Sequence, residues 1–318
     1  MIRRFLTRNV PLTATTVVFL LLYVICSARY DGFFSWFQFA SLLSDNATLG
    51  LVAIGMTFVI LSGGIDLSVG ALLAFSSMLF SLLLTSGSMH WGIAIPCVLL
   101  IGLGFGAGMG AVIALFRLPP FIVTLAGMFL ARGLALVLSP DKRISVSTDP
   151  VYTNLGTISV HELTLPALTV LVVAVIAVVF ARSTRFGRYV YAVGGSETSA
   201  LLMGVRVGRT KLRIYALSGF LAALAGIIQV IGTGAGDASV ANTMELDAIA
   251  SVVIGGTLLT GGSGHVAGTL LGVLILGIIS TIPSYQGDLN SWWIKIGIGV
   301  LLLAFILLQR LVQSRMAR

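Results

Sequence analysis

The sequence predicts an all-α, polytopic membrane protein with about ten transmembrane helices, some short or broken, and with both termini in the cytoplasm. Of its 318 residues, 57% are apolar and only 9% are charged, whereas average soluble domains carry about 25% charged residues. The apolar residues form long blocks, and the basic residues are confined to a few segments between them. Residues 1–318 are therefore expected to form a single transmembrane domain.

Apolar blocks of this length can cross a bilayer as helices. In chain order, the ten expected spans cover residues 10–28, 47–62, 70–86, 92–115, 121–138, 165–181, 214–234, 248–260, 266–282 and 291–309. The first follows a basic, signal-like start without a clear cleavage site, so we expect it to be retained. The blocks at 47–62 and 248–260 are short for complete spans, and either is expected to be a broken or re-entrant helix.

Basic residues orient the chain. Three segments hold 13 of the 19 basic residues: the N-terminus with Arg3, Arg4 and Arg8, the stretch at 182–213, and the C-terminus with Arg310, Arg315 and Arg318. The positive-inside rule places all three in the cytoplasm, and six crossings before the stretch and four after it satisfy this. The same topology puts these acids on or near the outer side: Asp31, Asp45, Asp141, Asp149, Glu162, Asp237, Glu245, Asp247 and Asp288.

Glycines recur along the expected span at 92–115. Gly102, Gly106 and Gly110 follow one four-residue register, and Gly104 and Gly108 follow a second. Such spacing places small residues on one side of a helix, where another backbone can approach closely. Tight helix packing is the expected role, although sliding of one helix past another is compatible with the pattern.

Two stretches of the chain are similar to each other. LSGGIDLSVG covers residues 61–70 and LTGGSGHVAG covers residues 259–268, and both have a leucine, paired glycines and a final glycine at matching positions. This similarity suggests a duplicated five-helix unit.

Several kinds of binding chemistry are not supported by the sequence. It contains no GxxxxGK[ST] phosphate loop, so the chain is not expected to bind ATP by that route. The net charge of +8 comes from residues between spans, which favours membrane orientation over nucleic-acid binding. Cys26 and Cys97 lie inside apolar blocks and lack metal-ligand or disulfide spacing. We expect no nucleic-acid partner, no metal site and no cofactor.

A membrane peptidase is one alternative. GGSG at 261–264 matches the Gly-x-Ser-Gly form of intramembrane serine peptidases, and His265 follows it. A Ser–His dyad needs the imidazole within hydrogen-bond reach of the hydroxyl, and such enzymes obtain it from a different helix. Because the chain has 37 glycines, a short glycine–serine pattern is common by chance, and the motif alone is weak evidence for catalysis.

Acidic residues beside the spans are candidates for a pathway or for helix caps. Asp66 follows Gly63 and Gly64 just before an expected span. An acid between apolar spans is costly and usually has a role, but its carboxylate can also accept backbone N–H bonds at a helix start, and we favour this capping interpretation. Glu245 and Asp247 either cap the span that follows them or receive a basic partner.

Two basic residues also lie near spans. Arg132 follows an apolar run, and Lys295 stands near the start of the last expected span. Either can snorkel to an interface or pair with an acid, and neither defines a site by itself.

The basic stretch at 182–213 contains a short predicted helix. Ser196 can cap free N–H groups, Glu197 stands in the first turn where the helix dipole favours an anion, and Gly204 can end the helix. A helix of about two turns is marginal in water. Its apolar residues are therefore expected to pack either on the protein's own cytoplasmic ends or in a cytoplasmic partner.

Five stretches resemble a known family: LVAIGMTFVILSGGIDLSVG (51–70), LPPFIVTLAGMFLARG (118–133), TRFGRYVYAVGGSETSALLMGVRV (184–207), LSGFLAALAG (217–226) and ELDAIASVVIGGTLLTGGSGHVAGTLLG (245–272). They resemble permease subunits of bacterial carbohydrate ABC importers of the ribose, xylose and galactoside type, and most closely a galactofuranose importer permease. The stretches extend from the second expected span almost to the ninth, so the resemblance covers nearly the whole chain.

This resemblance implies that the stretch at 182–213 carries a coupling helix, which sits in a cleft of an ATP-binding subunit and passes its closure to the spans. The implied contact residues are Gly195, Ser196, Glu197, Ala200, Leu201, Met203 and Gly204. The family often has GGN followed by two alanines, whereas this chain has Ser196 and then Ser199 before Ala200. Serine and asparagine both cap helices, so the departure bears on the choice of ATPase partner.

The resemblance further implies a non-catalytic, multi-pass subunit of the bacterial inner membrane that works by alternating access. Its implied partners are a separate ATP-binding subunit, a periplasmic sugar-binding protein, a second permease in a heterodimer rather than a homodimer, and the surrounding lipid. A ribose- or xylose-type permease is an alternative within the family. An ATP-independent secondary transporter is an alternative outside it and would typically carry intramembrane ionisable residues, of which this sequence offers few.

Overall fold

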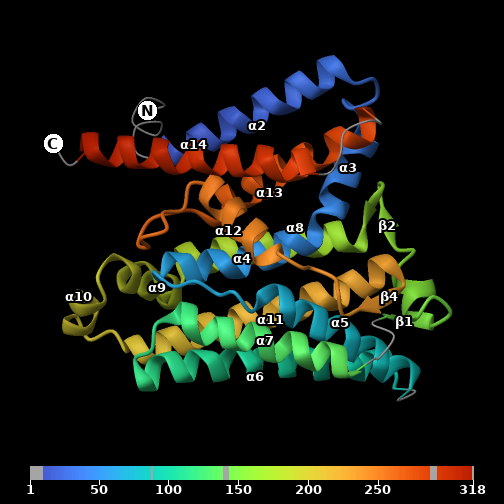
Figure 1. Ribbon diagram of the computed structural model, residues 1–318, viewed down its shortest axis with the longest axis horizontal. Coiled ribbons are helices and arrows are strands. Elements are labelled where there is room, and N and C mark those ends of the chain that lie inside the picture. The colour runs from blue at the N-terminus through green and yellow to red at the C-terminus, as the bar shows by residue number, and fades with distance from the viewer. Residues whose placement is uncertain (1–9, 87–88, 139–142, 287–291, 317–318) are drawn as a thin grey trace.

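The computed structural model is a bundle of helices (Figure 1) and describes residues 10–86, 89–138, 143–286 and 292–316. Six charged residues used to orient the chain lie outside the described residues: Arg3, Arg4, Arg8, Asp141, Asp288 and Arg318. The α-helices are α2 (Val10–Arg29), α3 (Trp36–Asp45), α4 (Ala47–Leu61), α5 (Val69–Thr85), α6 (Trp91–Phe116), α7 (Pro120–Leu138), α8 (Leu165–Ser183), α9 (Arg185–Gly195), α10 (Glu197–Leu202), α11 (Val207–Thr233), α12 (Met244–Ile254), α13 (Val266–Gln286) and α14 (Trp292–Met316).

Each of the ten expected spans overlaps a helix, although α12 ends at Ile254, before the end of the expected span at 248–260. Fewer helices are long and apolar enough to cross a membrane. Within the described residues five qualify, namely α2, α6, α7, α8 and α11, and a sixth is counted if α3 and α4 form one bent span. The apolar parts of α5, α13 and α14 are shorter, and α12 has only 11 residues. A count of ten complete spans is therefore not confirmed.

The break expected around 47–62 is present. α3 and α4 meet at an angle of 57°, and Asn46 stands between them. Its backbone leaves the helical region, with φ −101° and ψ 8°, and its side-chain amide donates to the carbonyl of Leu42 at 2.8 Å. The asparagine side chain thereby satisfies a carbonyl at the end of α3, a typical way for asparagine to interrupt a helix.

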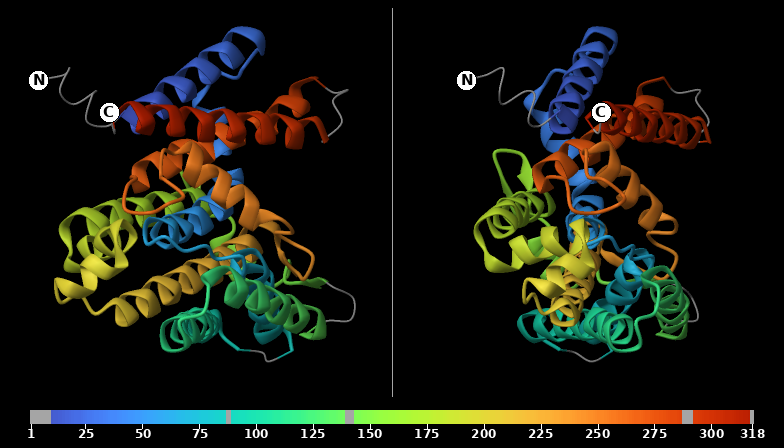
Figure 2. Two further views of the ribbon diagram at one scale, coloured as in Figure 1. Left: turned by 60° about the vertical axis from the view of Figure 1, so that its left-hand side comes forward. Right: turned by 90° about the vertical axis from the view of Figure 1, so that its left-hand side faces the viewer.

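α4 and α11 form the centre of the bundle. Every residue of α4 except Leu49 is buried, and the most apolar 18-residue window of α11 is 72% buried, against 11% for α2. In Figures 1 and 2, α2 and α14 lie on one side of this centre and α6 and α7 on the other. α10 lies at the end of the molecule to which the start of α2 and the end of α14 also point (Figure 1), an arrangement compatible with the expected topology.

The glycine seam of α6 packs against α11, as its spacing predicts. A Cβ added to Gly106 would collide with the carbonyl oxygen of Tyr215, and one added to Gly110 would lie 2.8 Å from the Cα of Leu212. In the second register, a Cβ at Gly108 would have nothing within 4 Å. Only the first register is therefore needed for the close approach of the two helices.

Two short antiparallel ribbons depart from the all-α prediction. β1 (Arg143–Ser145) pairs with β4 (Ala235–Asp237), and β2 (Ser159–Val160) pairs with β3 (Leu163–Thr164). A π-helical turn, η1 (Val151–Leu155), lies between the ribbons in the chain. All of these elements lie at the end of the molecule opposite α10 (Figure 1), in segments whose composition carries no period-two pattern long enough to predict strands.

The two similar stretches adopt related turns. Gly63 and Gly261, which stand at matching positions, both have a left-handed backbone, with φ of +81° and +84°. The next helices, α5 and α13, begin at Val69 and Val266. The sequence similarity therefore corresponds to one left-handed glycine at the same position in each turn, and each turn leads into an apolar helix. The next glycines differ, because Gly262 is left-handed and Gly64 is not.

Candidate coupling site

The segment around α10 folds as its sequence punctuation predicts. The Ser196 hydroxyl accepts a hydrogen bond from the N–H of Ser199 at 3.2 Å, and Glu197 stands in the first turn. Gly204 follows the helix with φ +82°, the left-handed conformation that favours glycine at a helix end. With six residues, α10 depends on packing for its stability.

Most of the chain on either side of α10 is helical and does not form a simple loop. α8 continues to Ser183, α9 fills most of the segment before α10, and α11 begins at Val207 rather than at residue 214. Three basic residues of the stretch at 182–213 therefore stand on the first turns of α11: Arg209, Lys211 and Arg213.

One face of α10 is buried and the other is open. Ala200 has no exposed surface and packs with Val193, Val205 and Val207. Leu201, Leu202 and Met203, which we call the apolar tip, are 63%, 84% and 70% exposed. Adjacent exposed apolar side chains outside the lipid-facing spans indicate a binding surface.

The apolar tip differs from the contact set implied by the resemblance. Ala200 anchors the helix to the protein and does not face outward, while Leu202, absent from that set, is the most exposed of the tip residues. Gly195, Ser196, Glu197 and Gly204 are exposed beside the tip. The exposure of Leu202 could have been predicted from the sequence. If Ala200 is the buried contact of the helix, Leu202 lies about 200° away around the helix axis and therefore faces outward.

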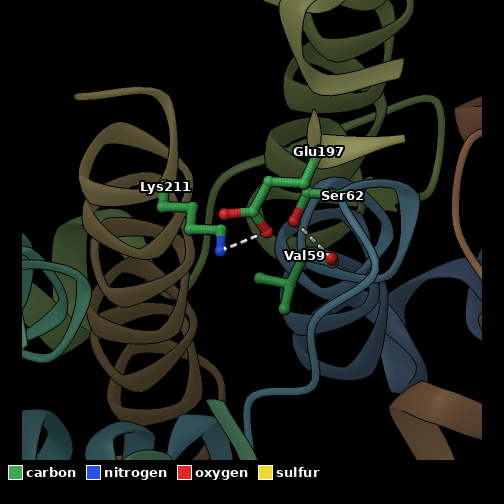
Figure 3. Close-up of polar contacts among 4 residues, drawn as sticks. All are labelled: Val59, Ser62, Glu197 and Lys211. Atoms are coloured by element: carbon green, nitrogen blue, oxygen red, sulfur yellow. Dashed lines mark hydrogen bonds and ion pairs between the residues drawn. The ribbon is translucent and has the colours of Figure 1, made fainter. Parts of the chain in front are cut away.

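An ion pair joins α10 to α11. Figure 3 shows Lys211 Nζ facing Glu197 Oε2, and the two atoms lie 2.7 Å apart. The same view shows the hydroxyl of Ser62 donating to the carbonyl of Val59 at 2.7 Å, which closes the end of α4. Because the Glu197 side chain is 57% exposed, we expect the ion pair to stabilise the fold by no more than about 1 kcal/mol.

Backbone segments from three parts of the chain meet where α9 ends. Gly63, Gly194, Gly261 and Gly262 form this contact, which we call the glycine junction. The N–H of Gly262 donates to the carbonyl of Leu61 at 2.9 Å. A Cβ on Gly261 would lie 2.8 Å from the nitrogen of Gly63 and 3.0 Å from the oxygen of Gly194, and a Cβ on Gly194 would collide with the Leu61 oxygen. The end of α9 thus touches the turn after α4 and the turn before α13.

Asp66 is fully buried and links two helices. Its Oδ1 accepts from the N–H of Ser68 at 3.0 Å and from the Ser68 hydroxyl at 2.6 Å, and its Oδ2 accepts from the Ser218 hydroxyl of α11 at 2.7 Å. The backbone bond lies immediately before α5, while the bond to Ser218 was not expected from the sequence. Beside it, a Cβ on Gly64 would lie 2.5 Å from the Tyr215 hydroxyl, so the turn passes close to α11.

The acids before the eighth expected span lie in the first turn of α12. A Cβ on Gly70 would lie 2.7 Å from Glu245 Oε2, so the starts of α5 and α12 are neighbours. Arg132 of α7 donates to the carbonyl of Ala238 at 2.7 Å, which holds the segment leading into α12. Asp247 stands in the same first turn, and Lys295 lies on α14.

The residues of the peptidase motif lie in the turn before α13. Tyr191 of α9 donates from its hydroxyl to the carbonyl of Gly264 at 2.9 Å, which fixes this turn against α9. Ser263 and His265 line one cleft there. Across the residues that the structure describes, no group of three or more His, Cys, Asp or Glu side chains could hold a metal ion.

A multi-pass helical bundle with short and interrupted helices is typical of a membrane permease. Comparison with known proteins specifies the family. The chain belongs to the family of permease components of branched-chain amino acid transport systems, and the match covers residues 38–306.

Named relatives extend over nearly the whole chain. It is 48% identical to the inner membrane ABC transporter permease protein YjfF of Escherichia coli K12, over 95% of this chain and 92% of the relative. It is 39% identical to the fructose import permease protein FruG of Bifidobacterium longum, over 96% and 92%. It is 40% identical to the ribose import permease protein RbsC of Bacillus subtilis, over 91% and 90%.

No solved structure matches the chain. The relatives and the apolar helices place the protein in the inner membrane as a multi-pass permease. The family match gives no support to the peptidase hypothesis.

Proposed function

We propose that this chain is the translocating subunit of an ATP-driven sugar importer and that its sugar is galactofuranose. The import of a sugar is supported by relatives named for ribose and fructose import. The choice of galactofuranose rests on the resemblance of the five quoted stretches. The chain itself supplies the pathway, and ATP hydrolysis belongs to a separate subunit.

The observation that carries the coupling role is the apolar tip. Leu201, Leu202 and Met203 project from a helix whose opposite side is fully buried through Ala200. A cytoplasmic ATP-binding subunit with an apolar cleft would cover these side chains, and at about 25 cal/mol per Å² of buried apolar surface this burial is favourable. Ser196 and Glu197 lie at the edge of the same contact.

The glycine junction supplies a route from the apolar tip to the spans. Gly194 lies two residues before the α10 cap and touches the turns after α4 and before α13. Because these contacts are between backbones, a displacement of α10 that moves the end of α9 cannot be absorbed there by side-chain rotation. Closure of the ATP-binding subunits would therefore shift both turns, and the spans would exchange outward for inward opening.

The proposed assembly contains further subunits. A periplasmic sugar-binding protein would deliver the sugar, and a second, different permease would complete the pathway. The mass of the purified complex tests this composition: a complex containing two copies of this chain and no other permease would contradict the heterodimer.

Sugar uptake into proteoliposomes that contain the assembled transporter tests the function. Radiolabelled galactofuranose, ribose, xylose and fructose are offered with and without ATP. We expect ATP-dependent accumulation of galactofuranose. Accumulation of another sugar would overturn the choice of substrate alone, whereas equal uptake without ATP would overturn the importer and favour a secondary transporter.

The apolar tip is tested with a matched pair of variants, by measuring binding of the ATP-binding subunit and sugar uptake in the same proteoliposomes. Leu202→Asp places a charge in the proposed contact, and Leu202→Met keeps an apolar side chain of similar size. Central interface residues contribute about 2 kcal/mol or more, so we expect Leu202→Asp to weaken binding of the ATP-binding subunit roughly 30-fold, while Leu202→Met changes it little. Unchanged binding and uptake in Leu202→Asp would contradict the role of the tip.

A further inference from the structure

The cleft lined by Ser263 and His265 lies beside the glycine junction, on the side of α8 and α13. Its volume is about 520 Å³. It is lined by Arg182 at the end of α8, by Arg188 and Tyr191 of α9, and by the turn from Gly262 to His265. None of the three residues of the apolar tip lines this cleft.

The cleft lies at the level where apolar spans end. Arg182 stands in the last turn of α8, which has the highest mean hydropathy of the candidate spans, at 2.5. His265 immediately precedes α13, whose apolar part begins at Val266. A cleft between two such helix ends lies at the height of the lipid headgroups.

The lining of the cleft is cationic. Two arginines and a histidine line it, and none of the described residues around it is an aspartate or a glutamate. Arg188 Nη1 donates to the carbonyl of Ser183 at 3.5 Å, which leaves other guanidinium donors for a ligand. Burial and, to a smaller extent, the positive charge of Arg182 lower the pKa of His265, so the positive charge of the lining comes from the two guanidinium groups. An anion would be attracted to both of them.

An apolar stripe on α8 leads to the cleft. Val175 and Val179 are 65% and 56% exposed, and they precede Arg182 by seven and three residues. These spacings place all three on one face of the helix. An acyl chain lying along the two valines would bring its headgroup to Arg182, which favours a lipid over a soluble anion.

We propose that this cleft binds the phosphate of an anionic phospholipid, with Arg182 and Arg188 as its principal partners and with one acyl chain along Val175 and Val179. Phosphate oxygens accept the paired N–H donors of arginine, and basic pockets at the cytoplasmic ends of spans bind lipid headgroups. The proposal does not depend on which sugar is transported or on ATP coupling.

Binding at this site would also act on the glycine junction. Gly262 belongs both to the cleft and to the junction, where its N–H is bonded to Leu61. Tyr191 lines the cleft and holds Gly264. A bound headgroup would therefore bridge α9 and the turn before α13, and would hold together two of the three segments that meet at the junction.

Native mass spectrometry of the full-length chain tests the proposal. The protein is released from micelles containing equal amounts of phosphatidylglycerol and phosphatidylcholine with identical acyl chains. We expect one phosphatidylglycerol to be retained in preference to phosphatidylcholine. In the double variant Arg182→Gln/Arg188→Gln, affinity should fall about 30-fold, because each basic residue near an anionic lipid contributes roughly a factor of five.

Arg206→Gln/Arg209→Gln is the matched control, since it removes two exposed charges of the same basic stretch that do not line the cleft. It should keep the bound lipid, and Arg182→Lys/Arg188→Lys should keep most of it if the fold is intact. Equal loss in both glutamine variants would overturn the site in favour of diffuse attraction. Displacement of the lipid by millimolar glycerol phosphate would overturn the lipid as ligand in favour of a free phosphate, and no preference for phosphatidylglycerol would overturn both.

Discussion

Gly194 and Gly195 are neighbours at the end of α9, yet an added methyl group would meet different surroundings at the two positions. A Cβ on Gly194 would collide with the Leu61 oxygen and would lie 2.6 Å from the Gly262 nitrogen. A Cβ on Gly195 would have nothing within 4 Å. Alanine at Gly194 must therefore separate two backbones, whereas alanine at Gly195 displaces nothing.

The contacts of Gly194 allow the magnitude to be worked out. Overpacking of a well-packed site costs about 1–3 kcal/mol. Separation of Gly262 from Leu61 also removes a hydrogen bond, which contributes about 0.5–1.5 kcal/mol. We expect Gly194→Ala to lower the free energy of unfolding by about 1.5–4.5 kcal/mol in total. Gly195→Ala should change it by less than about 1 kcal/mol, because only helix propensity differs.

Chemical unfolding of the two purified variants in one detergent, followed by circular dichroism, measures this difference. ATP-driven uptake by the same variants then tests whether the junction transmits movement, since Gly194→Ala should lower uptake beyond what its folded fraction accounts for. Equal unfolding free energies for the two variants would refute the backbone contact. A destabilised Gly194→Ala whose folded fraction transports normally would refute the route of transmission while leaving the contact intact.

Three further predictions follow from single contacts. In α6, Gly106→Ala should destabilise the chain by about 1–3 kcal/mol, because the added methyl group meets the backbone of Tyr215. Its control, Gly108→Ala, meets open space and should be neutral or slightly stabilising. Equal midpoints of thermal unfolding for the two variants would contradict the packed register. Ser218→Ala removes the hydrogen-bond donor to Asp66 Oδ2 and should lower the free energy of unfolding by about 1–3 kcal/mol, because the buried oxygen is left without that donor. Its control is Ser239→Ala, a change at an exposed serine outside the helices. An equally small effect of both variants in the unfolding assay would argue against the buried hydrogen bond. Glu197→Gln should change the free energy of unfolding by less than about 1 kcal/mol, because the ion pair of Glu197 is exposed. Glu197→Arg places a second positive charge beside Lys211 and should weaken binding of the ATP-binding subunit in a pull-down assay. Normal binding by Glu197→Arg would show that Glu197 is not part of the proposed contact.

Local signals in the sequence predicted several elements well. The cap at Ser196, the first-turn acid and the glycine stop define α10 almost to the residue, because all three act within a single turn. The glycine register of α6 likewise predicted a packed face. Which of its two registers packs could not be predicted, since that depends on where α11 lies.

Long-range contacts could not be predicted from the sequence. The hydrogen bond of Asp66 to Ser218 joins residues 152 positions apart, and no local pattern marks such a pair. The structure does not confirm ten complete spans, because the apolar blocks around α5 and α12 form short helices that are buried inside the protein. Hydropathy reports that a segment avoids water, and it does not distinguish lipid from protein as the surroundings.

The glycine junction connects the two similar stretches to a single helix, α9. Gly63 and Gly261 occupy matching positions in the two similar stretches, and both have a left-handed backbone. A Cβ on Gly261 would lie 3.0 Å from the Gly194 oxygen, whereas the stretch that contains Gly63 approaches Gly194 through the Leu61 oxygen. A duplicated unit would ordinarily need a separate contact for each half. Here one helix, α9, touches both turns through Gly194. A single docking event at the apolar tip would therefore reach the turn after α4 and the turn before α13 together, and the two would be displaced in concert rather than in sequence.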